Sequence, residues 1–81
     1  MSINVRYFAS LKESLGRSED SLPFSGLLTV KDVWNRANPD KSLPDNILAA
    51  LNMDYVELDN IVKDGDEVAF FPPVTGGWRW P

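Results

Sequence analysis

Few residues in this chain have side chains that could do chemistry. The sequence contains no Cys and no His, which removes thiol nucleophiles, disulfides, the usual zinc ligands and the side chain most often used for proton transfer near neutral pH. Carboxylates, lysines, hydroxyls and the chain terminus remain. Near that terminus, the segment Pro72-Pro73-Val74-Thr75-Gly76-Gly77 combines a diproline with a glycine pair. Each proline lacks an N–H and fixes φ, so this segment is expected to leave a sheet as a tail that cannot fold back onto it.

Size and charge narrow the function further. A chain of 81 residues, 43% of them hydrophobic, is expected to form one domain with a modest core and little room for a deep catalytic pocket. The net charge of −4 and the scattered Lys and Arg argue against nucleic acid, and suit either a basic protein partner or simple solubility. Residues 1–8 do not resemble a signal peptide, and no stretch approaches a membrane span. We expect a soluble cytoplasmic protein with no membrane or nucleic-acid partner.

The elements that must position the tail begin with a strand. Ile3, Val5 and Tyr7 alternate with Asn4, Arg6 and Phe8, which predicts a half-buried strand. The period then changes at residues 8–15 to that of a short helix, with Gly16 placed for a left-handed C-terminal cap. Residues 18–24 predict a second strand that pairs with the first, at a sheet edge because of Pro23.

The best helix follows a capping box. Thr29-Val30-Lys31-Asp32 can satisfy free N–H groups at a helix start, and residues 30, 33, 34 and 37 are apolar at helical spacing. Residues 38–40 end this helix, and Trp34 is expected in the core. Residues 47–51, 55–58 and 67–71 are predicted strands, with turns at 52–54 and at 63–66.

This order of elements predicts an α+β fold. Strand, helix, strand, helix and three further strands leave too few helices for two helical layers. We therefore expect a mixed sheet of about five strands packed on one main helix. The acidic residues Asp64, Asp66 and Glu67 are interpreted as turn chemistry at a solvated edge, and no metal site is assigned.

The end of the sequence closely resembles the C-terminal signature of the small subunit of molybdopterin synthase. The matching segment runs from Asp64 to Gly77, and the family is also matched by residues 5–9, the leucines and Gly16 of the first helix, residues 29–32 and Asn52. This resemblance implies a β-grasp fold like that of ubiquitin, over essentially the whole domain. It implies a non-catalytic sulfur-carrier subunit in the biosynthesis of the molybdenum cofactor.

What the resemblance implies for chemistry centres on Gly77. Its carboxyl would be adenylated by a separate ubiquitin-activating-like adenylyltransferase, with ATP used by that enzyme, and then converted to a thiocarboxylate. The tail of residues 72–77 would enter the large subunit of molybdopterin synthase, where sulfur passes to a cyclic pyranopterin phosphate. No cofactor bound by the chain itself is implied. Glycine at positions 76 and 77 suits a narrow channel because it has no Cβ.

Two aromatic residues suggest where a partner would dock. If Ile3, Val5 and Tyr7 face the main helix, alternation places Phe8 on the other face of the sheet. The same reasoning on the last strand separates Phe71 from Val68 and Phe70. We expect Phe8 and Phe71 to be exposed, and the resemblance places both in contact with the large subunit. The alternative is that the first helix or a loop covers them.

Four residues continue the chain beyond the glycine pair that ends it in the family. With Trp78-Arg79-Trp80-Pro81 attached, Gly77 has an amide where the chemistry needs a carboxylate. We therefore divide the chain into a sulfur-carrier domain with its tail, residues 1–77, and an extension, residues 78–81. The extension is expected to be removed by a processing peptidase; otherwise it is an artefact or a divergent terminus.

Three other functions remain open. A ubiquitin-like modifier conjugated to lysines through Gly77 would use the same activation chemistry. A thiamine-type sulfur carrier shares the implied fold and tail, although the sequence Phe-Phe-Pro-Pro at 70–73 favours the molybdopterin family. A binding domain with a permanent extension would not activate Gly77 at all.

Overall fold

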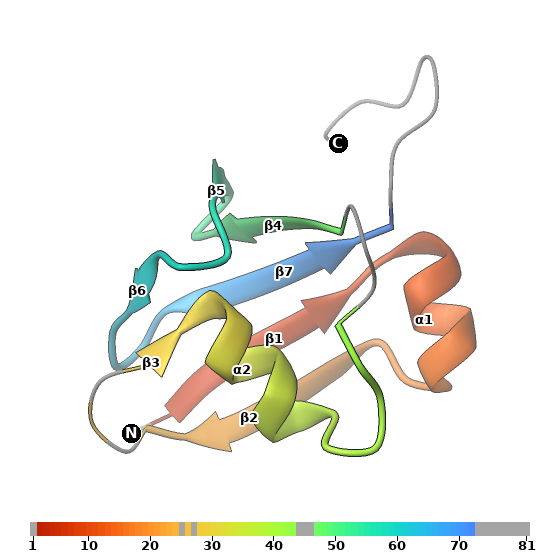
Figure 1. The fold of residues 1–81 in the computed structure, drawn as a ribbon, viewed down its shortest axis with the longest axis horizontal. Helices are drawn as coiled ribbons and strands as arrows, with labels where there is room; N and C mark the ends of the chain where they lie inside the picture. Colours follow the sequence, from red (N-terminus) through yellow and green to blue (C-terminus); the bar gives the residue numbers. More distant parts are fainter. Residues whose placement is uncertain (1, 25, 27, 44–46, 73–81) are drawn as a thin grey trace.

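The computed structural model describes residues 2–24, 26, 28–43 and 47–72. Figure 1 shows the order of the elements and their arrangement in space. In chain order these are β1 (Ser2–Tyr7), α1 (Ala9–Leu15), β2 (Glu19–Pro23), β3 (Leu28–Thr29), α2 (Val30–Ala37), β4 (Leu48–Leu51), β5 (Asp54–Val56), β6 (Ile61–Val62) and β7 (Glu67–Phe71).

Five of the strands form one mixed sheet in the order β2-β1-β7-β4-β5. The first and last strands, β1 and β7, pair in parallel, with Val5 opposite Val68 and Tyr7 opposite Phe70. The other neighbours are antiparallel. This sheet confirms the predicted α+β fold, and it places β7, from which the tail leaves, between β1 and β4.

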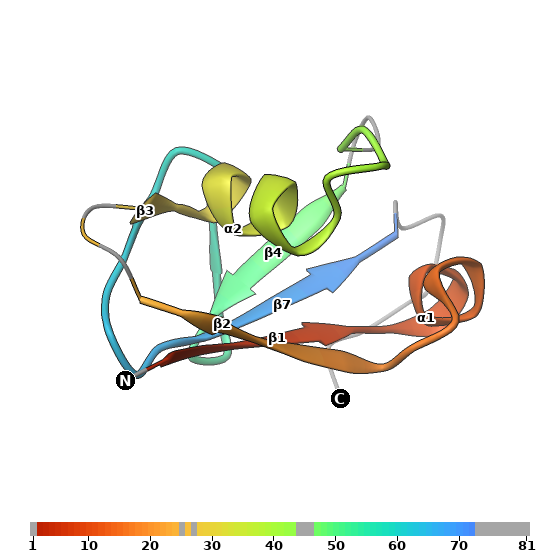
Figure 2. The ribbon, with the colours of Figure 1, turned by 90° about the horizontal axis from the view of Figure 1, so that it is seen from below.

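The main helix α2 lies across one face of this sheet (Figure 2). It begins at the predicted capping box: the Asp32 N–H donates to Thr29 Oγ1 at 3.2 Å, and the Thr29 N–H donates to Asp32 Oδ2 at 2.9 Å. These two bonds satisfy N–H groups that have no partner inside the helix, which fixes where α2 starts. The helix ends at Ala37, as the following Asn38-Pro39 predicted.

Apolar side chains between α2 and the sheet form the core. Trp34 is 1% exposed, as predicted, and its ring meets Phe70 edge-on at 5.1 Å between centroids. Its indole N–H donates to the Lys41 carbonyl at 3.1 Å, so the one polar atom of the ring is satisfied. Around it lie Ile3, Val5, Tyr7, Leu11, Leu28, Val30, Val33, Ile47, Ala49, Val62, Val68 and Phe70.

Turns at both ends of the sheet follow the predicted positions. Gly16 caps α1 with φ 75°, and Gly65 has φ 87° in the turn before β7. The loop between β4 and β5 consists of Asn52 and Met53, with φ values of 49° and 74°. Positive φ at both residues is the requirement of a type I′ hairpin turn.

The sequence analysis did not predict the second, two-stranded sheet of this fold. β3 and β6 form a separate two-stranded sheet, with Leu28 opposite Val62 and Thr29 opposite Ile61. Strands of two residues are too short to show a periodic pattern in the sequence. Neither helix of the described chain, the longer having eight residues, could cross a bilayer.

Candidate functional site

The tail leaves the sheet from its middle. Phe71 is the last paired residue of β7, opposite Leu48 of β4, and on the other side the Phe8 N–H donates to the Phe70 carbonyl at 3.2 Å. Pro72 follows at once and is half-buried. Because it has no N–H, Pro72 cannot extend the ladder as a donor. The other predicted tail residues, Pro73, Val74, Thr75, Gly76 and Gly77, and the extension 78–81 lie outside the described residues.

Beside this exit is a small apolar cluster on the face of the sheet opposite α2, which we call the outer face. Its members are Phe8, Leu48, Ala50, Ala69 and Phe71, separate from the main core. The rings of Phe8 and Phe71 stack with centroids 4.8 Å apart and planes 8° apart. Tyr55 of β5 approaches Phe71 at 6.2 Å, tilted by 58°. We refer to these six residues as the aromatic cluster.

The structure confirms one part of the prediction for Phe8 and Phe71 and corrects another. Both lie on the face opposite α2, as alternation required. The expectation that both would be exposed is wrong, because Phe71 is 0% exposed and Phe8 is half-buried. The rings stack on each other, and Phe71 also packs with Ala50 and Ala69. Alternation tells which face a side chain occupies, but not what packs above it.

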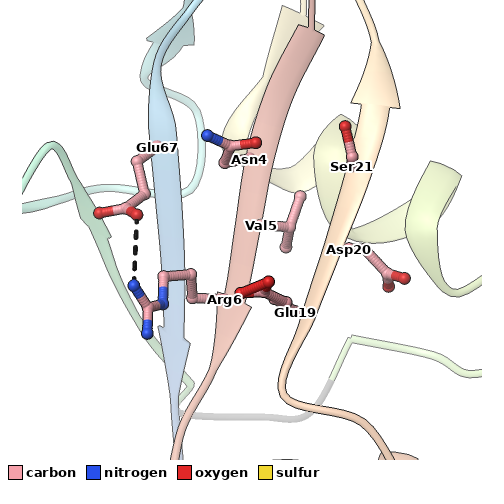
Figure 3. Close-up of a pocket in the computed structure, with 7 residues that line it drawn as sticks. All are labelled: Asn4, Val5, Arg6, Glu19, Asp20, Ser21 and Glu67. Atoms are coloured by element: carbon pink, nitrogen blue, oxygen red, sulfur yellow. Dashed lines mark ion pairs between the residues drawn. The ribbon is translucent and has the colours of Figure 1, made fainter.

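The other half of the outer face is polar (Figure 3). A groove of about 520 Å³ there is lined mainly by outward side chains of β1, β2 and β7. These polar residues are Asn4, Arg6, Glu19, Ser21 and Glu67. Arg6 pairs with Glu67 at 3.7 Å, and its guanidinium lies 5.8 Å from the Phe8 ring centroid. Arg6 therefore joins the polar half of the face to the aromatic cluster.

The carboxylate of Asp66, the residue before β7, organises a turn. Asp66 Oδ2 accepts the Lys63 N–H at 2.7 Å, and Asp66 Oδ1 accepts the Asn52 side-chain amide at 2.9 Å. Asn52 in turn accepts the Glu67 N–H at 3.0 Å. These bonds confirm the interpretation as turn chemistry for Asp66. Among the described residues, no group of three or more Asp or Glu is arranged to hold a metal ion.

A buried polar network ties β1 to the end of α2. The Tyr7 hydroxyl donates to Asp20 Oδ2 at 2.9 Å and accepts the Asn38 side-chain amide at 3.1 Å. Arg17 bonds Asp20 at 2.6 Å and the Ala37 carbonyl at 3.1 Å. Burial raises the pKa of Tyr7 above its usual value, and the nearby Asp20 adds to this rise. The residues of this polar network follow no regular spacing in the sequence, so no sequence pattern could have revealed the network.

Sequence reasoning also missed the small residues of the outer face. Ala50 is 1% exposed and Ala69 6%, directly opposite each other on β4 and β7. Residues 47–51 are all apolar, so the sequence shows no alternation between polar and apolar side chains there. Only the register of β4 against β7 shows which of these side chains lie on the outer face. What the described residues offer chemically is a surface for binding beside the point where β7 ends in the middle of the sheet.

The sequence of this chain is similar to those of known proteins. A sequence model of the ThiS family matches residues 5–77. The "Molybdopterin synthase sulfur carrier subunit" of Escherichia coli (strain K12) is 39% identical over 84 residues, which covers 93% of this chain and 99% of that protein.

Solved structures show the same fold. SAMP1 from Haloferax volcanii superposes with a TM-score of 0.78 at 29% identity, covering 95% of this chain and 100% of that one. In the "Protein-protein complex of subunit 1 and 2 of Molybdopterin-converting factor from Helicobacter pylori 26695", a chain that is 25% identical superposes with a TM-score of 0.65. That match covers 95% of this chain and 100% of the other. The β-grasp fold implied by the sequence is thereby confirmed.

Proposed function

The chain belongs to the ThiS family, and from that membership we propose that it is the sulfur carrier of a molybdopterin synthase, with the carboxyl of Gly77 as its reactive group. The observation that carries the proposal is the extent of the family match, which ends at Gly77 and leaves only residues 78–81 beyond it. The names of the curated relatives support the same role.

The chemistry needs only the chain end. Once residues 78–81 are removed, a carboxylate oxygen of Gly77 attacks the α-phosphorus of ATP in the adenylyltransferase, and pyrophosphate leaves. Hydrosulfide then attacks the acyl carbon and displaces AMP, and loss of the sulfur-bound proton yields the thiocarboxylate. Adenylation is required because an unactivated carboxylate has no good leaving group. The cytoplasm is the proposed location, because this step consumes ATP.

The outer face is the proposed docking surface for the large subunit. The complex of the two Helicobacter pylori subunits supports a partner of this kind. In this chain the tail leaves β7 next to Phe8 and Phe71, so a partner seated on the aromatic cluster would lie where the tail begins. Arg6 and Glu67 lie beside the cluster and can supply polar contacts at the rim.

The test uses the full chain and a chain that ends at Gly77. Each is incubated with the activating enzyme, ATP and a sulfur donor, and examined by mass spectrometry. The shorter chain is expected to form the adenylate and then to exchange one carboxyl oxygen for sulfur, and the full chain to remain unmodified. A shorter chain that never forms the adenylate would contradict the proposal.

A second candidate is a protein modifier. The observation that favours it is the likeness to SAMP1, whose name in other solved structures is small archaeal modifier protein 1. In this role Gly77 would be joined to lysines of other proteins by the same activated carboxyl. A ladder of conjugates in cell extract, lost when the chain is truncated before Gly76, would favour the modifier over the carrier. A thiamine-type carrier has less support, because the curated relatives carry the molybdopterin name.

A further inference from the structure

The strand β2 forms one edge of the five-stranded sheet, and in the described part of the chain it pairs only with β1. Figures 1 and 3 show it as the outermost strand. The Tyr7 N–H donates to the Ser18 carbonyl at 2.9 Å, so the alternation of an antiparallel ladder also turns the backbone groups of Asp20 toward β1. The N–H and C=O groups of the residues between them, Glu19 and Ser21, therefore point away from the sheet.

This edge has the form of a site for strand addition. A row of outward N–H and C=O groups is a template on which another chain can pair. Pro23 at the end of β2 has no N–H, so the outward donors of the strand are those of Glu19 and Ser21, both of which are exposed residues. The strand at the opposite edge of the sheet, β5, has only three residues. Of these two edges, β2 is therefore the better suited to hold a short added strand.

The outer-face side chains beside this edge favour a cation. Glu19 lies opposite Arg6 in the register of β1 and β2, but Arg6 makes its ion pair with Glu67, at 3.7 Å. The Glu19 carboxylate has no ion pair within the described residues. Asp20, which also lines the polar groove, is already paired with Arg17 at 2.6 Å. One guanidinium thus lies near two carboxylates, which leaves a negative charge beside β2 for a basic side chain to neutralise.

The inner-face side of the same strand favours an apolar side chain. Leu22 packs against the main core but remains half-buried, and the same is true of Phe24 just beyond the strand. A strand added beside β2 places its side chains alternately on the two faces. A basic side chain opposite Glu19 would therefore lie on the outer face, and an apolar one opposite Leu22 would lie on the inner face. We infer that the free edge of β2 binds an extended basic segment of a partner protein as an additional strand, with a Lys or Arg of that segment against Glu19.

This edge is separate from the docking surface of the proposed function, and the inference does not depend on Gly77. The aromatic cluster lies around β7 and β4, whereas β2 lies beyond β1. Neighbouring strands are about 4.8 Å apart, so β2 is about 10 Å from β7. The two surfaces can therefore be occupied by different partners. The net charge of −4 over the whole chain suits the approach of a basic one.

Titration of the full chain with a model peptide tests the inference. The peptide is Lys-Val-Lys-Val-Lys-Val-Lys, blocked at both ends, and NMR gives its Kd and the exchange rate of each backbone N–H with water. Bound peptide should slow the exchange of the Glu19 and Ser21 N–H groups about tenfold, because they gain acceptors. The N–H of Asp20, which already faces β1, should change little. The matched peptide Lys-Lys-Lys-Lys-Val-Val-Val keeps the composition and charge without the alternation, and it should bind about tenfold more weakly.

Variants of β2 separate the backbone contribution from the charge. Ser21→Pro removes an outward N–H and leaves the bonds to β1 in place, so it should weaken binding of the alternating peptide about tenfold. Ser21→Ala keeps that N–H and should bind like the original chain. Glu19→Gln should weaken binding about two- to fivefold, as expected for an exposed ion pair. Glu13→Gln, an equal change of charge at an exposed position of α1, should leave the Kd unchanged.

Three results would overturn the inference. One is equal binding of the two peptides, because charge alone would then account for it. Another is unchanged exchange at Glu19 and Ser21 with the alternating peptide at millimolar concentration. The third is exchange at these two positions that slows with rising protein concentration in the absence of peptide, because a second copy of the chain would then occupy the edge. These measurements use the unaltered chain, so they decide the question even if Ser21→Pro does not fold.

Discussion

Replacing Tyr7 by Phe should destabilise the fold, because the buried side-chain amide of Asn38 loses its hydrogen-bond acceptor. Tyr7 is 2% exposed at the end of β1, and its hydroxyl is both donor to Asp20 and acceptor for Asn38. Phenylalanine keeps the ring, and with it the edge contact to Trp34 at 6.1 Å and the stacking on Phe70 at 6.3 Å. The loss is therefore almost entirely polar.

Losing the hydrogen bond to the hydroxyl costs its two partners, Asp20 and Asn38, unequal amounts of free energy. Asp20 keeps its bond to Arg17 at 2.6 Å, and its side chain is 27% exposed, so water can replace the tyrosine. Asn38 is only 5% exposed, and its side-chain amide would lose its acceptor in the interior. A buried donor left without a partner costs about 1–3 kcal/mol. A domain of 81 residues has a total stability of roughly 4–12 kcal/mol, so the loss should be easy to measure.

Urea unfolding followed by circular dichroism measures this change. The midpoint should fall by roughly 0.5–3 M, at slopes of about 1–2 kcal/mol per M. Tyr55→Phe is the matched control: this residue is 53% exposed, and surface changes of this kind cost about 0.5 kcal/mol or less. If Tyr7→Phe costs no more than Tyr55→Phe, the reasoning about Asn38 is refuted.

The same variant carries a signature at high pH. The pKa of Tyr7 is raised in the folded state, mainly by burial, above its ordinary value of 10.0. The folded protein then holds this proton more tightly than the unfolded chain does. The stability from this group is complete below pH 10 and is lost as the pH rises through the raised folded value. The original protein should lose stability more steeply than Tyr7→Phe above pH 10, and parallel curves would contradict this.

The remaining predictions use other parts of the chain. Thr29→Ala should lower the free energy of unfolding by about 1 kcal/mol, because it removes the side-chain cap of α2. In the unaltered chain the Thr29 N–H lowers the pKa of Asp32, so the stability that Asp32 contributes should be lost as the pH falls below 3.8. A free energy of unfolding that does not change with pH in this acid range would contradict the prediction for Asp32. Gly65→Ala should destabilise the fold by about 1–2 kcal/mol through its positive φ alone, since nothing lies within 4 Å of the added Cβ. Met53→Gly should raise the urea midpoint, because glycine adopts the positive φ of this hairpin turn without strain. A higher midpoint for Gly65→Ala or a lower one for Met53→Gly would contradict this account. Gly77→Val in the chain ending there should unfold normally yet block activation, and a normal rate of thiocarboxylate formation would show that the glycine is not needed.

Most of the fold could be predicted because each main element carries a local physical cause. The capping box fixed the start of α2, alternation identified β1, and the diproline marked the end of β7. The resemblance over residues 64–77 then indicated the family. The pair β3–β6 was missed because two-residue strands owe their existence to neighbours distant in sequence.

The site was predicted less completely for the same reason. Alternation correctly separated Phe8 and Phe71 from the core, but their exposure depends on what packs above the sheet. Ala50 and Ala69 become part of the site only through the register of β4 against β7. The network of Tyr7, Arg17, Asp20 and Asn38 depends on contacts between three segments, which no pattern within one segment encodes.

The two faces of the sheet have different tasks. The inner face provides the core, whereas the outer face is apolar where the tail begins, beyond what the core requires. An apolar patch beside the end of β7 is suited to binding a partner, so the outer face can serve recognition while the inner face maintains the fold.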